Sequence, residues 1–158
     1  MRAGHLPIVG EGIQASSQQN GHYNRRVYSA ELLDHFENPR NAGQVKDPDA
    51  RAHLENPVCG DVLELSLRLE KTRLETTRLN ETKSEGRRVA DIRFRAKGCV
   101  PTMACGSAIT ELVKGKSVDE ARQLSREELV AKVGGLPQAS DHASHLAMDT
   151  LAVLLRGL

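Results

Sequence analysis

The sequence is poor in aromatic side chains and has no excess of charge of one sign. Its 158 residues include two Phe, two Tyr and no Trp, and 22 Lys and Arg stand against 21 Asp and Glu. Proteins that bind single-stranded nucleic acid stack its bases on aromatic rings. A strongly basic surface attracts nucleic acids or anionic membranes. The composition therefore predicts no nucleic-acid partner and no membrane partner.

Long apolar runs are absent as well, and cysteines are few. No segment approaches the roughly 18 to 20 apolar residues that cross a bilayer, and the first residues lack the apolar stretch of a signal peptide. We therefore expect a cytoplasmic protein. The three cysteines are an odd number, and thiols stay free in a reducing compartment. Each is thus a candidate metal ligand, reactive thiol or buried small side chain.

The length of the chain fits one domain with a core of its own. Residues 1–26 are rich in Gly, Ser, Gln and Asn and show no periodicity. We expect them to form a disordered N-terminal tail, followed by one domain over 27–158. A short helix should open this domain, because Ser29 can cap it and Asn38-Pro39 ends it.

Alternation of apolar and polar residues predicts two strands. From Asp61 onward, leucines at every second position share one face, and the same alternation returns from Ala90 to Lys97. The simplest connection is an antiparallel hairpin, and a third short strand is expected over 52–56. Residues 71–88 are polar and charged. We interpret them as a hairpin insert that forms a solvated loop, extends the two strands or docks a partner.

The C-terminal half has helical periodicity. Pro101 suits the first turn of a helix whose apolar stripe runs to Val113. Two Ser-x-x-Glu capping boxes predict two short helices over 117–133, and a last helix is expected over 140–156. Strands followed by helices indicate an α+β fold, a small three-stranded antiparallel sheet with helices packed on one face.

Two of the cysteines flank the predicted hairpin. Cys59 lies in NPVCGD, at a turn before the first strand, and Asp61 follows two residues later. Cys99 follows the second strand and precedes a helix, whose free N–H groups and dipole favour a thiolate, so we expect its pKa to be lowered. Strand pairing brings both cysteines together with Asp61. They form an incomplete ligand set for zinc or an iron-sulfur cluster.

Other candidate residues carry weaker signals. His142 begins the last predicted helix, with His145 on the same face, and a histidine there is usually a surface residue. Cys105 falls on the apolar stripe of its helix, which favours a core position, yet it is about one turn from the helix start and within reach of a ligand near Cys99. No HExxH or paired CxxC motif is present. The zinc-finger and metalloprotease templates therefore do not fit.

Four segments of the chain resemble, in order, those of the IscU/NifU-type iron-sulfur cluster assembly scaffolds. They are YSAELLDHFENPRNAG, NPVCGD, KGC followed by CGSAITELVKGKS, and LPQASDHASHLAMDTL. The resemblance covers 28–156 apart from the insert. It implies a scaffold without turnover of its own, on which a cysteine desulfurase deposits sulfur, iron is bound, and a [2Fe-2S] or [4Fe-4S] cluster is built and passed to acceptor proteins.

The resemblance also implies a set of ligands. The family's first cysteine, aspartate, second cysteine and histidine match Cys59, Asp61, Cys99 and His142. Ala143 stands where the family has a third cysteine, which is its usual persulfide acceptor and a cluster ligand. We therefore expect the four matching residues to hold iron or the cluster, and Cys105 to be the candidate replacement for the missing thiol. On its expected pKa, Cys99 is the best remaining persulfide carrier.

Two alternatives remain open at this point. One is a zinc-bound sulfur-relay partner of a cysteine desulfurase, as the SufU-like branch implies. That branch carries an insertion between its second and third cysteines and lacks the histidine, and both features differ here. The other is a fold retained only for binding the desulfurase. A homodimer that shares one site is also left open, and 136–140 reads LPQAS instead of the bacterial chaperone-recognition segment LPPVK, which argues against dependence on that chaperone.

Overall fold

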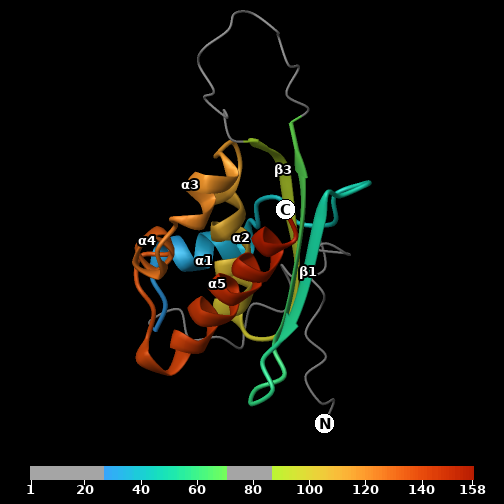
Figure 1. Ribbon diagram of the computed structural model, residues 1–158. Helices are drawn as coiled ribbons and strands as arrows, with labels where there is room; N and C mark the ends of the chain where they lie inside the picture. The colour runs from blue at the N-terminus through green and yellow to red at the C-terminus, as the bar shows by residue number, and fades with distance from the viewer. Residues whose placement is uncertain (1–26, 71–86) are drawn as a thin grey trace, which may run out of the picture.

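The computed structural model describes residues 27–70 and 87–158 (Figure 1). The expected N-terminal tail at 1–26 lies outside the described residues. So does the expected insert at 71–88, apart from Arg87 and Arg88. The described part consists of a sheet and a group of helices that pack on it.

The sheet has three antiparallel strands in the order β1-β2-β3. These strands are β1 (Ala50–Glu55), β2 (Val62–Leu69) and β3 (Val89–Lys97). In the middle strand, Leu63 is paired with Leu54 on one side and Ala96 on the other. The predicted third strand and the antiparallel pairing of the two alternating segments are confirmed, and β1 begins two residues earlier than expected.

Three of the helices in the described ranges begin at side-chain caps that the sequence indicates. The helical segments, in chain order, are α1 (Ala30–Glu37), α2 (Val100–Val113), α3 (Val118–Arg122), α4 (Arg126–Lys132), the 3₁₀ turn η2 (Gln138–Ser140) and α5 (Asp141–Arg156). The Ser29 side chain caps α1 by accepting the Leu32 N–H, and Ser117 and Ser125 each form a complete capping box. Each such cap satisfies N–H groups that a helix start leaves unpaired, and is worth about 1 kcal/mol.

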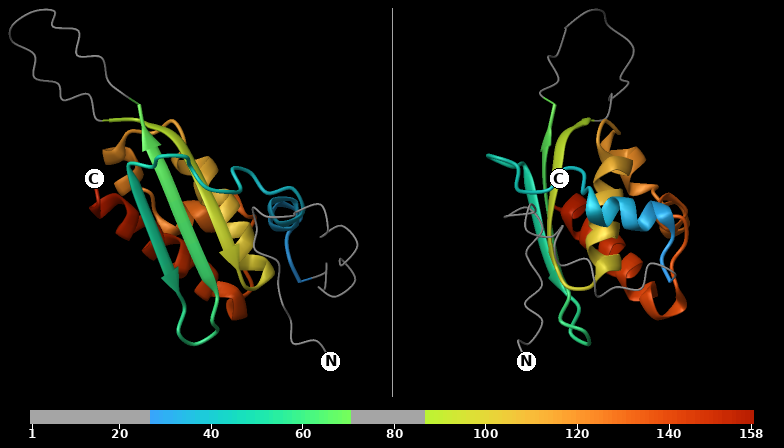
Figure 2. Two further views of the ribbon diagram at one scale, coloured as in Figure 1. Left: turned by 90° about the vertical axis from the view of Figure 1, so that its right-hand side faces the viewer. Right: turned by 180° about the vertical axis from the view of Figure 1, so that it is seen from behind.

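The helices lie together on one face of the sheet, with α2 and α5 against the strands and α1 against α2 (Figure 2). The predicted α+β fold is thus confirmed. None of the helices in the described ranges is long and apolar enough to span a membrane.

The core is built by the leucines of β2 and by a close approach of α2 to the sheet. Leu63, Leu65 and Leu67 are fully buried, and burial of each contributes roughly 1.5–3 kcal/mol. Gly106 permits the close approach, because a Cβ there would come within 2.6 Å of the Phe94 ring. This packing fixes the start of α2 at the end of β3. The β1–β2 turn and the starts of α2 and α5 therefore lie at the same end of the molecule (Figure 1).

Candidate metal centre

Cys59 lies in the turn that joins β1 to β2. The Asn56 side-chain oxygen accepts the Val58 N–H at 2.9 Å, and the Gly60 N–H donates to the Asn56 carbonyl at 2.8 Å. Gly60 has a φ of +73°, which glycine adopts without steric cost. The turn leaves the Cys59 side chain exposed and directs Asp61 inward, where only 5% of its surface is exposed.

Cys99 lies at the junction of β3 and α2, directly beside Asp61. The Cys99 Sγ donates to Asp61 Oδ2 at 3.1 Å, and the Cys99 N–H donates to Asp61 Oδ1 at 3.3 Å. Gly98 has a φ of +149°, and a Cβ on it would lie 2.2 Å from Asp61 Oδ1. Only glycine therefore leaves room for the carboxylate at this junction.

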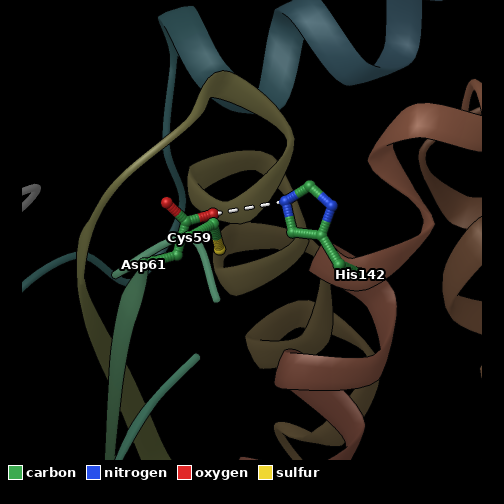
Figure 3. Close-up of side chains that lie close together, drawn as sticks. All are labelled: Cys59, Asp61 and His142. Carbon is green, nitrogen blue, oxygen red and sulfur yellow. Dashed lines mark ion pairs between the residues drawn. The ribbon is translucent and has the colours of Figure 1, made fainter. Parts of the chain in front are cut away.

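His142 approaches the same carboxylate from the first turn of α5. Its Nε2 lies 3.4 Å from Asp61 Oδ2 and 3.6 Å from Cys99 Sγ. Figure 3 shows the imidazole directed at Asp61, with Cys59 beside the carboxylate. One ligand atom from each of Cys59, Asp61 and His142 lies within 4.8 Å of the other two. Sulfur, oxygen and nitrogen donors at this spacing can close on a metal ion.

Residues 27–156 match the family described as the NifU-like N terminal domain. The chain belongs to this family. It is 36% identical over 125 residues to the iron-sulfur cluster assembly scaffold protein IscU 1 of Archaeoglobus fulgidus, across 79% of this chain and 72% of that protein. The scaffold protein IscU of Aquifex aeolicus is 34% identical over 129 residues, or 82% of this chain and 74% of the relative. The resemblance stated from the sequence is confirmed.

The fold agrees with a solved structure of the same family. A NifU-like protein (N-terminal) from Brucella abortus superposes with a TM-score of 0.59, at 21% identity, over 83% of this chain and 93% of that one. At this identity the likeness shows the fold alone. The arrangement of sheet and helices described above is thus that of other NifU-like domains.

The ionisation of Cys99 differs from the expectation. Burial raises the pKa of its thiol to about 11, and the Asp61 carboxylate adds to the increase, while the Thr102 hydroxyl acts in the opposite direction. The predicted lowering of this pKa was wrong, because the start of α2 is covered and lies against an anion. A helix start favours a thiolate only where the thiol is not also desolvated beside a negative charge.

The pKa of Asp61 is shifted in the opposite direction to that of Cys99. Burial alone would raise its pKa, but hydrogen bonds from the Cys99, Thr102 and Cys59 side chains, together with the Cys99 backbone N–H, lower it below the usual value. The carboxylate is therefore an anion held by several donors. Such an anion is the natural partner of a bound cation.

Cys105 lies in the core of this NifU-like domain, in the second turn of α2. Its side chain is 0% exposed, and burial raises its pKa to about 12. Ala143, the position of the family's third cysteine, is also buried, with 1% exposed. His145, the other histidine of α5, pairs with Asp141 at 3.4 Å and is largely exposed. The contacts among the described residues thus group Cys59, Asp61, Cys99 and His142, and they include neither Cys105 nor His145.

Thr102 is a site residue that sequence reasoning missed. Its hydroxyl donates to Asp61 Oδ2 at 2.7 Å and lies 3.2 Å from Cys99 Sγ, and only 1% of the residue is exposed. Its spacing from Cys99 could have indicated this role. Thr102 lies three positions after the N-cap Cys99, and the side chain of such a residue can turn back toward the cap. A hydroxyl in an apolar helix start is otherwise unexpected.

Proposed function

We propose that this NifU-like domain is a scaffold and carrier for iron-sulfur cluster assembly, which binds iron and a nascent cluster and passes it to acceptor proteins. The observation that supports this most is the convergence of Cys59, Asp61, Cys99 and His142 from the β1–β2 turn, the β3–α2 junction and the start of α5. No substrate has to be turned over there, so the site holds cargo and is not catalytic.

The cluster would be held by a mixed set of donors. Two thiolates suit iron in a [2Fe-2S] or [4Fe-4S] cluster, and an imidazole replaces a thiolate in some such clusters. A carboxylate oxygen is a harder ligand than sulfur, so Asp61 in this set makes the cluster easier to release. Easy release is what a carrier needs.

The partners follow from this role. A cysteine desulfurase would supply the sulfur, and iron-sulfur acceptor proteins would take the finished cluster. The relatives named as iron-sulfur cluster assembly scaffolds support the scaffold role on which these partners depend. We place the protein in the cytoplasm, because its three cysteines are free and thiols remain free in a reducing compartment. A homodimer that shares one cluster is the form that would supply further ligands in place of the missing third cysteine.

A zinc-bound sulfur relay is the second candidate. The supporting observation is that single donors of Cys59, Asp61 and His142 lie within 4.8 Å of one another, with Cys99 Sγ in contact with two of them. Four such ligands are the number that a closed zinc site takes. In this role zinc stays bound and the thiols pass sulfur from a desulfurase.

Anaerobic purification followed by metal analysis and absorption spectroscopy separates the two functions. After reconstitution with iron and sulfide, the scaffold should show sulfur-to-iron charge-transfer bands, and His142→Ala should weaken iron retention at least about tenfold. His145→Ala is the matched control, because this histidine lies one turn further along α5 and outside the group. A colourless protein with one tightly held zinc would instead support the relay.

A further inference from the structure

The Asp61 carboxylate is held by groups that differ in what happens to them when a metal binds. Oδ1 accepts the Cys99 backbone N–H at 3.3 Å. Oδ2 contacts three side chains, the Thr102 hydroxyl at 2.7 Å, the Cys99 thiol at 3.1 Å and the His142 Nε2 at 3.4 Å. The carboxylate also accepts a hydrogen bond from the side chain of Cys59, itself a candidate ligand. Of the three side chains at Oδ2, two are likewise candidate ligands. Thr102 is the exception.

Because of this difference, only some of these groups can still hydrogen-bond to the Asp61 carboxylate after a metal ion has bound. A cysteine that binds a metal loses its S–H proton, so Cys99 can then no longer donate to Oδ2. A histidine that binds through Nε2 turns that atom to the metal. The Thr102 hydroxyl keeps its proton and its place on α2, and a carboxylate oxygen has a second lone pair for a metal.

We propose that Thr102 is a positioning residue of this site, whose hydroxyl fixes Oδ2 of Asp61 beside Cys99 and thereby sets how firmly the site holds its metal. The inference rests on the proposed function. Thr102 is 1% exposed, so water does not replace its hydrogen bond when the hydroxyl is removed. Hydrogen bonds of this outer kind orient metal ligands, and their loss typically weakens metal binding about 10- to 100-fold.

The test measures the affinity of the whole chain for Co²⁺ under anaerobic conditions, by competition with a chelator. Thr102→Val keeps the shape of the side chain and removes the hydroxyl, and we expect it to weaken Co²⁺ binding about 10- to 100-fold. Thr102→Ser returns the hydroxyl and should restore most of the affinity. The sulfur-to-cobalt charge-transfer band, measured per bound Co²⁺, should weaken in the valine variant and recover in the serine variant. A change in folding stability alone would alter the amount of bound Co²⁺ but not the band per bound ion.

Thr150→Val is the matched control. Thr150 is fully buried in α5, and its hydroxyl donates to the Leu146 carbonyl at 2.7 Å, so the same substitution removes a buried hydrogen bond away from Asp61. It should leave Co²⁺ affinity unchanged. If Thr102→Val does not fold, Thr102→Ala gives the same comparison.

The outcomes separate this inference from the proposed function. A parent protein that binds Co²⁺ while Thr102→Val binds it equally well would overturn the role of Thr102 and leave the scaffold function standing. A serine variant as weak as the valine variant would do the same. A parent protein that binds neither Co²⁺ nor iron would overturn both.

Discussion

At the scale of single residues, the three cysteines of the NifU-like domain differ mainly in what covers them. Cys59 is exposed in a turn, Cys99 is partly covered between β3 and α2, and Cys105 is buried in the core. Exposure decides whether a thiol can meet another protein or a reagent, and burial beside an anion keeps a thiol protonated. The cysteine that the sequence favoured as sulfur carrier, Cys99, is therefore the less accessible of the two site thiols.

Alkylation of the metal-free protein at pH 7.5 should follow this order. Iodoacetamide should modify Cys59 first and Cys99 at least about tenfold more slowly, because the thiolate is the reactive form. Cys105 should react only after unfolding. Peptide mass spectrometry over a time course gives the three rates, and protein unfolded in guanidinium, where the order should vanish, is the control. Equal rates at Cys59 and Cys99 would show that the start of α2 does favour the thiolate.

At the scale of elements, the site depends on junctions rather than on the interiors of helices and strands. The antiparallel register pairs Val62 with Lys97, which places Asp61 next to Gly98. Strand alternation alone was enough to predict this convergence of the Cys59 turn with Cys99. The approach of α5 was not predictable from spacing, because it depends on how helices pack over the whole face of the sheet. The sequence linked His142 to the site only through the family resemblance.

Gly98→Ala tests the β3–α2 junction. The new Cβ would lie 2.2 Å from Asp61 Oδ1 and sit on a residue with a φ of +149°, so we expect a loss of about 1–3 kcal/mol in stability. Displacement of the carboxylate should also weaken Co²⁺ binding at least about tenfold. Chemical denaturation and chelator competition measure the two effects.

Gly115→Ala is the control for that substitution. Gly115 lies beyond the far end of α2, has a φ of +82° and has nothing within 4 Å of an added Cβ. The Gly115→Ala variant should lose a similar amount of stability through backbone strain alone, and it should keep the Co²⁺ affinity of the parent. Full Co²⁺ affinity in Gly98→Ala would mean that Asp61 does not need its present position to serve the site.

At the scale of the whole molecule, patterns along the chain predicted the parts of the fold that depend on local signals. Alternation of apolar and polar residues marked β2 and β3. The caps at Ser29, Ser117 and Ser125, together with Pro101, marked four of the five α-helix starts in the described ranges. Burial could not be predicted in the same way, because it depends on contacts between distant segments. For this reason the pKa of Cys99 was predicted with the wrong sign and Thr102 was missed. The helical stripe indicated a core position for Cys105, and its burial agrees with that interpretation.

The two covered thiols should make the folded protein sensitive to alkaline pH. Burial raises the pKa of Cys105 to about 12 and is the main cause that raises that of Cys99 to about 11. Below the ordinary thiol pKa of about 8.5, both the folded and the unfolded chain keep these protons. Above it the unfolded chain releases them while the folded chain retains them, so the unfolded state gains and stability falls as the pH rises toward 11.

Urea unfolding of the reduced, metal-free protein at pH 8 and pH 10.5 measures this loss. Lys and Tyr also titrate in this range, so the comparison is with Cys105→Ala, which keeps those groups and removes one buried thiol. The variant should be less stable at pH 8, because it leaves a small cavity. Its further loss up to pH 10.5 should be about 2 kcal/mol smaller than that of the parent. If both proteins lost the same stability over this range, the Cys105 thiol would have to ionise in the folded protein as easily as in the unfolded chain, and its place in the core would be wrong.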